Sequence, residues 1–310
     1  MLETEELSKT FKDKVAVEGV NIYLERGESV GLLGPNGAGK STTISMISSL
    51  IKPTSGDVLL DGINVIKDPS KIRRVLGVVP QDIAIYEELT AYENLKFFGR
   101  IYGLRGKELE ENIKDVFELV GLTDRQKDIV KTYSGGMKRR VNIAAALLHN
   151  PEILIMDEPT VGIDPQSRSH ILDMVRELNL KKKMTVLYTS HYMEEVERLC
   201  DRVYIMDHGR IITSGTKDEL KSILSGEETI LIDLDRPYPN LFSELEKHEG
   251  ILQTLETENG LKLIVPKGSQ LLGELFQIAD RHHAQVLNVN IQTPTLEDVF
   301  LHLTGRKLRD

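Results

Sequence analysis

Gly34-Pro35-Asn36-Gly37-Ala38-Gly39-Lys40-Ser41-Thr42 is the stretch that decides the fold, and it satisfies the spacing G-x-x-x-x-G-K-[S/T] in full. Its glycines let the backbone turn tightly, so that successive N–H groups point at one bound anion. In such a loop Lys40 reaches nucleotide phosphates and the Ser41 hydroxyl is placed to ligate Mg²⁺. Residues 29–33 before it are a short apolar run, and residues 43–51 after it carry isoleucines at helical spacing. The stretch therefore predicts a phosphate loop between a strand and a helix N-terminus, where the helix dipole favours negative charge.

Length and composition limit the class of protein. The chain has 310 residues, 28% charged and 40% hydrophobic, and its length suggests two globular domains of roughly 100–200 residues each. A formal net charge of −9 argues against a nucleic-acid partner, because nucleic-acid-binding proteins normally carry a basic surface. The best apolar run, 141–148, falls short of the roughly 18 residues of a membrane span. The acidic residues 1–6 lack the pattern of a signal peptide, so we expect a cytoplasmic location.

A pair of carboxylates follows a second strand candidate. Residues 153–156 are four consecutive apolar residues, and they end in Asp157 and Glu158. Two carboxylates at the end of a buried strand are costly without a partner such as a metal ion or a proton. With a phosphate loop in the same chain, Asp157 is placed to organise Mg²⁺ and Glu158 to polarise an attacking water. The alternative is a plain strand-exit turn.

Four weaker signals lie at the ends of other expected elements. Gln81 and His191 follow strand candidates, and open α/β sheets place ligand groups at strand ends. Ser134-Gly135-Gly136 at a helix start is a second candidate anion site, and Phe11 is an aromatic that can stack on a base. Taken alone, each has a simpler interpretation: a surface amide, a structural histidine, a helix cap and a packing residue.

Together these motifs resemble the ATP-binding subunits of ABC transporters, over about residues 1–224. The matching motifs, in chain order, are Walker A at 34–42, the Q-loop at Gln81, the signature at Ser134-Gly135-Gly136, Walker B at Asp157-Glu158, the D-loop at Asp164 and the switch histidine His191. Tyr133 and Met137 depart from the usual Leu-Ser-Gly-Gly-Gln signature. This departure concerns fine geometry, since the serine and both glycines remain.

The resemblance implies an α/β fold, a P-loop NTPase core of the ABC ATPase type with an antiparallel β subdomain and an inserted helical subdomain at about 82–150. It implies an ATP-binding domain at 1–224 and leaves 225–310 as an accessory domain. The strand and helix order βαββαβ in that segment predicts a small ferredoxin-like α+β domain. Residues 295–300 resemble the C-terminal extension of the multidrug and daunorubicin-resistance branch, which implies an exporter with a separate ABC-2 type permease.

The resemblance also implies a role for each motif. Two such domains close head to tail around two ATP molecules, so this chain needs a second ATP-binding subunit, most simply a second copy of itself. The implied roles are adenine stacking by Phe11, phosphate binding by Gly34 to Thr42, Mg²⁺ coordination by Ser41, Gln81 and Asp157, general base catalysis by Glu158, γ-phosphate contact by His191, contacts across the interface by Ser134, Gly135 and Gly136, and communication between the sites by Asp164.

Two functions are consistent with this resemblance. The first is the ATP-hydrolysing subunit of a membrane exporter of drugs or other small lipophilic molecules, docked through the helical block 90–120 to a permease on the cytoplasmic face of the membrane. The alternative is a soluble ABC ATPase that remodels the ribosome or DNA. Such relatives usually carry two ATPase units or a long coiled-coil insertion, neither of which is present here. A further interpretation of the C-terminal domain is that it binds a small regulator.

Overall fold

The computed structural model describes residues 1–224, 226–292 and 294–305. The chain divides into two compact units, Met1–Thr216 and Lys217–Gly305. The second unit begins at Lys217, whereas the predicted accessory domain begins at residue 225.

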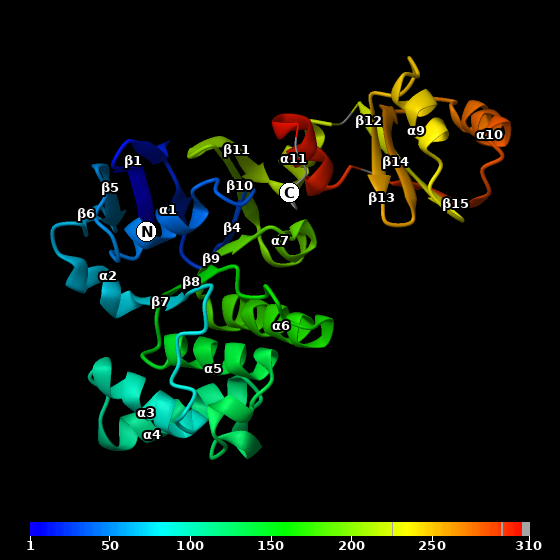
Figure 1. The fold of residues 1–310 in the computed structure, drawn as a ribbon. Helices are drawn as coiled ribbons and strands as arrows, with labels where there is room; N and C mark the ends of the chain where they lie inside the picture. The colour runs from blue at the N-terminus through cyan, green and yellow to red at the C-terminus, as the bar shows by residue number, and fades with distance from the viewer. Residues whose placement is uncertain (225, 293, 306–310) are drawn as a thin grey trace. The chain divides into compact units, whose positions relative to one another are not determined.

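A six-stranded sheet forms the centre of the first unit (Figure 1). Its order is β11 (Arg210–Thr216), β10 (Arg202–Asp207), β4 (Ser29–Leu33), β9 (Thr185–Ser190), β8 (Ile153–Asp157) and β7 (Leu76–Val79). All neighbours are parallel except the edge strand β11. Every residue of β4, β8 and β9 is buried, as expected for strands that are covered on both faces. The carboxyl ends of the parallel strands therefore meet at one edge of the sheet.

An antiparallel sheet forms a second layer of this unit. It contains β1 (Leu2–Phe11), β2 (Lys14–Val20), β3 (Tyr23–Leu24), β5 (Ser55–Leu60) and β6 (Ile63–Asn64). The sequence pattern did not predict β1. Only Leu2, Thr4 and Leu7 of this strand are buried, and Glu6 has a positive φ of 47° where the pairing is irregular. This irregularity breaks the period-2 alternation that marks a strand.

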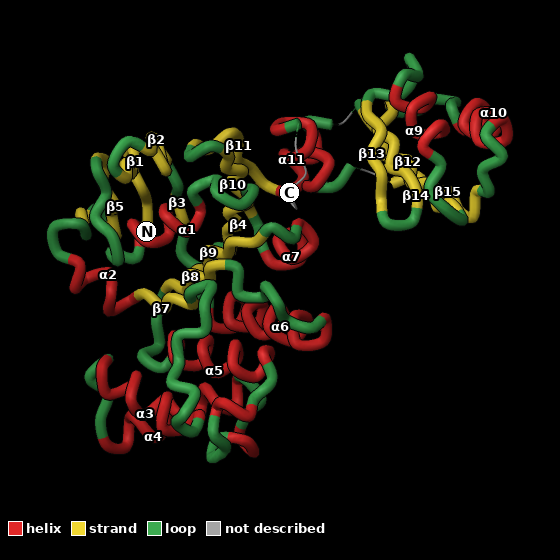
Figure 2. Tube along the Cα trace, in the orientation of Figure 1, coloured by secondary structure: helices red, strands yellow, loops and turns green. Residues whose placement is uncertain are grey.

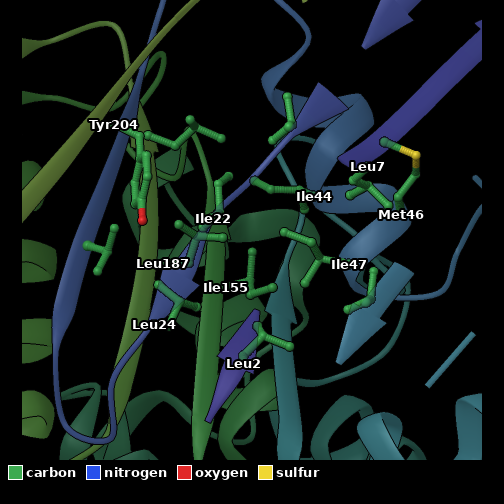
Figure 3. Close-up of a cluster of buried hydrophobic side chains, with 14 of the residues drawn as sticks. Leu2, Leu7, Ile22, Leu24, Ile44, Met46, Ile47, Ile155, Leu187 and Tyr204 are labelled. Carbon is green, nitrogen blue, oxygen red and sulfur yellow. The ribbon is translucent and has the colours of Figure 1, made fainter. Parts of the chain in front are cut away.

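The main core lies where α1 (Lys40–Ile47) contacts both sheets. Figure 3 shows Ile44, Met46 and Ile47 of this helix in one cluster with side chains of the two sheets. The helix begins at Lys40, within the glycine-rich stretch, rather than at residue 43 as expected, because Gly39 adopts a left-handed conformation at the N-cap. The phosphate loop is therefore anchored directly to the core.

Helices make up the remainder of the first unit. They are α2 (Pro69–Val75), α3 (Ala91–Ile101), α4 (Gly106–Leu119), α5 (Gly135–Leu147), α6 (Pro165–Lys182) and α7 (Met193–Leu199), with short turns at Thr123–Arg125 and Val130–Thr132. The predicted helical block corresponds to α3 and α4, and α3 starts at a capping box of Thr90 and Glu93. Figure 2 shows α5 and α6 together on one side of the sheet. The sequence pattern did not predict α2, whose seven residues hold one buried side chain, Ile72.

The second unit has the predicted ferredoxin-like topology. Its elements are α8 (Lys217–Ser222), β12 (Glu227–Leu234), α9 (Pro239–Glu246), β13 (Gln253–Thr257), β14 (Gly260–Pro266), α10 (Leu272–Arg281), β15 (Val286–Gln292) and α11 (Leu296–Thr304). The sheet order is β13-β14-β12-β15, with all neighbours antiparallel. The unit has its own apolar core beneath α9 and α10.

Candidate active site

The phosphate loop joins β4 to α1 and curls around the ammonium group of Lys40. Gly37 and Gly39 have φ values of 82° and 107°, which side chains rarely tolerate. The Lys40 Nζ donates hydrogen bonds to the carbonyl oxygens of Gly34 at 2.7 Å and Pro35 at 3.2 Å. The loop thus holds a buried cation within a glycine-rich turn, an arrangement that suits an anion.

A cavity of about 520 Å³ lies against this loop and gathers residues that are distant in the sequence. Its lining comprises Phe11, Lys14, Val15, Ala16, Asn36 to Thr42, Gln81, Glu158, His208 and Gly209. The structure therefore brings together the predicted stacking aromatic, most of the loop, the Q-loop amide and one carboxylate. A second cavity, of about 510 Å³, contains none of the predicted residues.

Glu158 stands between two other predicted residues. Its Oε1 atom is 3.1 Å from Lys40 Nζ, and its Oε2 atom is 3.2 Å from His191 Nδ1. The side chains of Lys40 and Glu158 are only 5% and 6% exposed. Glu158 also has a positive φ of 46°, which is unusual for a non-glycine residue. The carboxylate is thus held in a buried position between a cation and an imidazole.

Thr189 fixes both Walker B carboxylate residues. Its hydroxyl donates to Asp157 Oδ1 at 2.8 Å and accepts from the backbone N–H of Glu158 at 2.9 Å. Thr189 is fully buried at the end of β9, next to β8. The sequence places Thr189 at a strand end beside His191, but nothing in the local pattern reveals these two contacts.

The signature and D-loop residues lie together at two helix starts, and none of them lines the cavity. Ser134 caps α5, and Asp164 caps α6 by accepting from the backbone N–H of Ser167 at 2.9 Å. Hydrogen bonds from Ser167 lower the pKa of Asp164. A Cβ built on Gly136 would be 2.2 Å from Ser167 Oγ, whereas one built on Gly135 would be 3.8 Å from its nearest neighbour. The absence of a side chain at position 136 lets the two helices approach closely.

Arg139 attaches the Q-loop to α5. Its Nη1 donates to Pro80 O at 2.7 Å, and its Nη2 donates to the carbonyl oxygen of Gln81. Burial lowers the pKa of Arg139 from its ordinary high value, and the charge of Asp82 opposes this shift. The helix that begins at the signature therefore holds the backbone beside Gln81.

Sequence reasoning missed two segments that line the cavity, residues 14–16 and His208 with Gly209. The hairpin turn at His208 is tied to the loop, since Gly209 N–H donates to Ala38 O at 2.9 Å. Phe11, by contrast, is among the predicted residues, and it is 48% exposed. The pairing of β10 with β4 brings the turn to the loop, and no local signal in the sequence indicates it.

The donors present suit a nucleotide with a divalent cation. The Ser41 hydroxyl, the Gln81 amide oxygen and the Asp157 carboxylate are hard oxygen ligands, the type that Mg²⁺ prefers. Over the residues that the structure describes, no group of three or more His, Cys, Asp or Glu side chains could hold a metal by itself. The donor set therefore fits Mg²⁺ shared with phosphate oxygens, which is how proteins usually bind this ion.

Two family models match the chain. One, described as ABC transporter, covers residues 17–161. The other, described as the C-terminal domain of DrrA1-3-like ATP-binding proteins, covers residues 215–304. The first match lies within the first compact unit, and the second covers nearly all of the second unit.

Curated relatives match over nearly the full length. The linearmycin resistance ATP-binding protein LnrL of Bacillus subtilis (strain 168) is 48% identical over 100% of both chains. The daunorubicin/doxorubicin resistance ATP-binding protein DrrA of Streptomyces peucetius is 36% identical over 100% of this chain and 94% of its own.

Solved structures match the first unit. The ATP-binding subunit of an ABC transporter superposes with a TM-score of 0.66 at 33% identity, over 73% of this chain and 93% of its own. A dimeric ATP-binding cassette in a post-hydrolysis state with ADP and Pi gives a TM-score of 0.64 at 29% identity, over 70% of this chain and 98% of its own. None of the helices in the described part of the chain has the length and hydropathy of a membrane span.

Proposed function

This chain belongs to the drug-resistance branch of the ATP-binding subunits of ABC transporters, and from that premise we propose how its residues bind ATP and drive transport. As a member of this family it binds and hydrolyses ATP and powers an exporter. The relatives offer no support for a ribosome- or DNA-remodelling ATPase.

The cavity beside the phosphate loop is the proposed ATP site. Phe11 stacks on the adenine, because it presents an exposed ring at the rim of the cavity. The backbone amides of residues 34–42 and the Lys40 ammonium hold the phosphates. When bound, Mg²⁺ neutralises phosphate charge and orients the leaving group, and Ser41, Gln81 and Asp157 are its proposed ligands.

Glu158 is the proposed general base. It lies beside Lys40, so a γ-phosphate held by Lys40 would be close to the Glu158 carboxylate. A carboxylate there can take a proton from the attacking water as the P–O bond breaks. His191 is the proposed γ-phosphate contact, and its hydrogen bond to Glu158 limits the orientation of both side chains.

Each complete site is proposed to need two subunits. Ser134, Gly135 and Gly136 lie at the start of α5 outside the cavity that holds Lys40, and we propose that they act on ATP bound by a second subunit, with Asp164 beside them at the interface. Asp157 and His191 also do not line this cavity, but His191 contacts the cavity residue Glu158, and Thr189 joins Asp157 to Glu158. The similar cassette that was solved as a dimer supports an assembly of two subunits. A homodimer is the simplest form, because one chain carries one copy of every motif.

The helical block is the proposed docking surface for a separate permease. Tyr86, Phe97 and Phe98 form a cluster of ring contacts, with centroid distances from 5.1 to 6.2 Å. Nearby, Ile101 is 64% exposed and Tyr102 is also exposed. Exposed apolar groups of this kind suit a protein partner. Docking would hold the chain at the cytoplasmic face of the membrane, and the names of its relatives favour a transporter that confers resistance to a small toxic molecule.

Mixing two inactive variants tests the two-subunit site, whose main support is the position of Ser134 outside the cavity. Lys40→Ala removes the phosphate contact, and Ser134→Arg blocks the signature. Neither variant alone should hydrolyse ATP. A mixture should recover about a quarter of wild-type activity, because about half of the dimers are mixed and each has one intact site. Lys52→Ala, at an exposed lysine, is the control. Failure of the mixture to recover activity would contradict the proposal.

Detergent-solubilised complexes test the transport role. Affinity purification of the tagged chain from membranes should recover a hydrophobic permease with about six apolar stretches of roughly 20 residues. Recovery of ribosomal RNA or DNA in its place would favour the remodelling ATPase.

A further inference from the structure

Glu195 is a buried carboxylate to which the proposed mechanism assigns no role. It lies on α7 with only 2% of its surface exposed. Its Oε1 accepts from Thr160 Oγ1 at 2.7 Å, and its Oε2 accepts from Tyr188 OH at 2.9 Å and Ser190 Oγ at 2.8 Å. Burial raises the pKa of Tyr188 well above its ordinary value, and the negative charge of Glu195 adds to the shift. Three hydroxyl donors thus compensate the cost of burying this charge.

The hydroxyl partners of Glu195 flank the residues of the proposed γ-phosphate site. Thr160 follows Glu158 by two positions, and Ser190 directly precedes His191. The Ser190 hydroxyl also accepts from the backbone N–H of Tyr192 at 2.8 Å. The Glu195 carboxylate therefore restrains the residues on both sides of His191. It also restrains the segment that follows Glu158.

Arg168 connects the same carboxylate to the D-loop helix. Its Nε is 3.5 Å from Glu195 Oε1, and its guanidinium carbon is 4.4 Å from the ring centroid of Tyr192. The Tyr192 ring in turn lies 4.2 Å from the His191 ring. Arg168 is one turn after Asp164, to which it is joined by a backbone hydrogen bond. A continuous series of contacts thus joins the D-loop helix to the histidine.

We propose that Glu195 is a positioning residue for ATP hydrolysis, which holds His191 against Glu158 and ties both to the D-loop helix. The inference rests on the proposed roles of Glu158 and His191. Glu195 does not contact the cavity, so its effect on hydrolysis must pass through these neighbours.

Glu195→Gln keeps the size of the side chain but removes the charge and one acceptor. The amide nitrogen cannot accept from a hydroxyl, and Arg168 loses its ionic partner. A misplacement of about 1 Å at a reacting group costs about 10²-fold in rate. We therefore expect kcat to fall about 10- to 100-fold, while the KM for ATP changes less than about twofold, because the phosphate loop is untouched.

Glu194→Gln is the matched control, since Glu194 is the adjacent residue and is exposed; it should retain wild-type kcat and KM. A further measurement is single-turnover hydrolysis by His191→Ala, with and without Glu195→Gln. If Glu195 acts through His191, the second change should add little to the first. A purely structural effect would add in full to the loss caused by His191→Ala, and that result would overturn the inference.

Ser190→Ala keeps the inference testable if Glu195→Gln fails to fold. It removes the hydroxyl between Glu195 and Tyr192 without leaving the carboxylate alone, and it should lower kcat at nearly constant KM. Wild-type kcat in Glu195→Gln, or in Ser190→Ala if Glu195→Gln does not fold, would overturn the positioning role. If His191→Ala alone retains wild-type hydrolysis, the proposed function of His191 fails instead, so the two failures are distinguishable.

Discussion

The Lys40 ammonium and the Glu158 carboxylate form an ion pair at 3.1 Å in which both side chains are almost fully buried. A buried charge that loses its partner costs about 3–5 kcal/mol, so each residue constrains the other. The carbonyl oxygens of Gly34 and Pro35 also accept from Lys40. Phosphate oxygens that bind Lys40 would compete with Glu158 for the ammonium. Phosphate binding would then be coupled to release of the proposed general base.

Glu158→Gln should retain ATP binding but slow hydrolysis about 10²- to 10⁴-fold, because the amide cannot accept a proton from water. The ATP-bound dimer should live longer for the same reason. Nucleotide binding by fluorescence, steady-state ATPase assays and size-exclusion chromatography measure these effects. Glu177→Gln, at an exposed α6 glutamate paired with Lys181, is the control and should behave as wild type. Unchanged turnover in Glu158→Gln would refute the assigned role.

Thr189→Val should destabilise the protein by about 1–3 kcal/mol, because it leaves the Glu158 N–H and one Asp157 oxygen without a buried partner. The valine has nearly the same shape, so loss of packing does not explain the change. Thr189→Ser retains the hydroxyl and should recover most of the stability. Urea denaturation measures both variants. Equal stability of the valine and serine variants would show that the two hydrogen bonds contribute little.

The sequence predicts those parts of the fold and site that have a local pattern. Four consecutive apolar residues mark β8, because both faces of this strand are covered. Asp157 and Glu158 then follow at a strand end, where α/β sheets gather ligand groups. The meeting of Phe11, Gln81 and Glu158 around one cavity was expected from the family resemblance. Their chemical roles stay predictions.

Features that depend on long-range pairing had no local pattern. His208 reaches the cavity because β10 pairs with β4, although its position in the sequence is far from that of the phosphate loop at 34–42. Thr189 is unremarkable in the sequence, yet strand pairing sets its hydroxyl beside Asp157. The length of β1 was hidden by its irregularity at Glu6. In each case the deciding contact joins segments that are distant in the chain.

Gly136→Ala should destabilise the first unit by about 1–3 kcal/mol, because the added methyl must displace Ser167. Gly135→Ala meets no close atom and should be neutral or slightly stabilising, since alanine favours a helix over glycine by about 1 kcal/mol. Combining Gly136→Ala with Ser167→Gly removes the overlap and should restore part of the stability. Denaturation curves of the three proteins measure these differences. Equal stability of Gly135→Ala and Gly136→Ala would contradict the steric argument.

Stability should decline as the pH falls below about 6.5, in part through His149. Burial lowers the pKa of His149 from its ordinary value, although a hydrogen bond to Leu76 O opposes the shift. The unfolded chain therefore binds a proton near pH 6.5, while the folded chain binds it only at lower pH. Because the unfolded state holds more protons in this window, the free energy of unfolding rises with pH there and levels off above it. Urea denaturation at about pH 5.5 and about pH 7.5 should show a smaller pH difference for His149→Gln than for wild type. His170→Gln, at an exposed histidine, should keep the wild-type difference, and an identical pH dependence in all three proteins would exclude a contribution from His149.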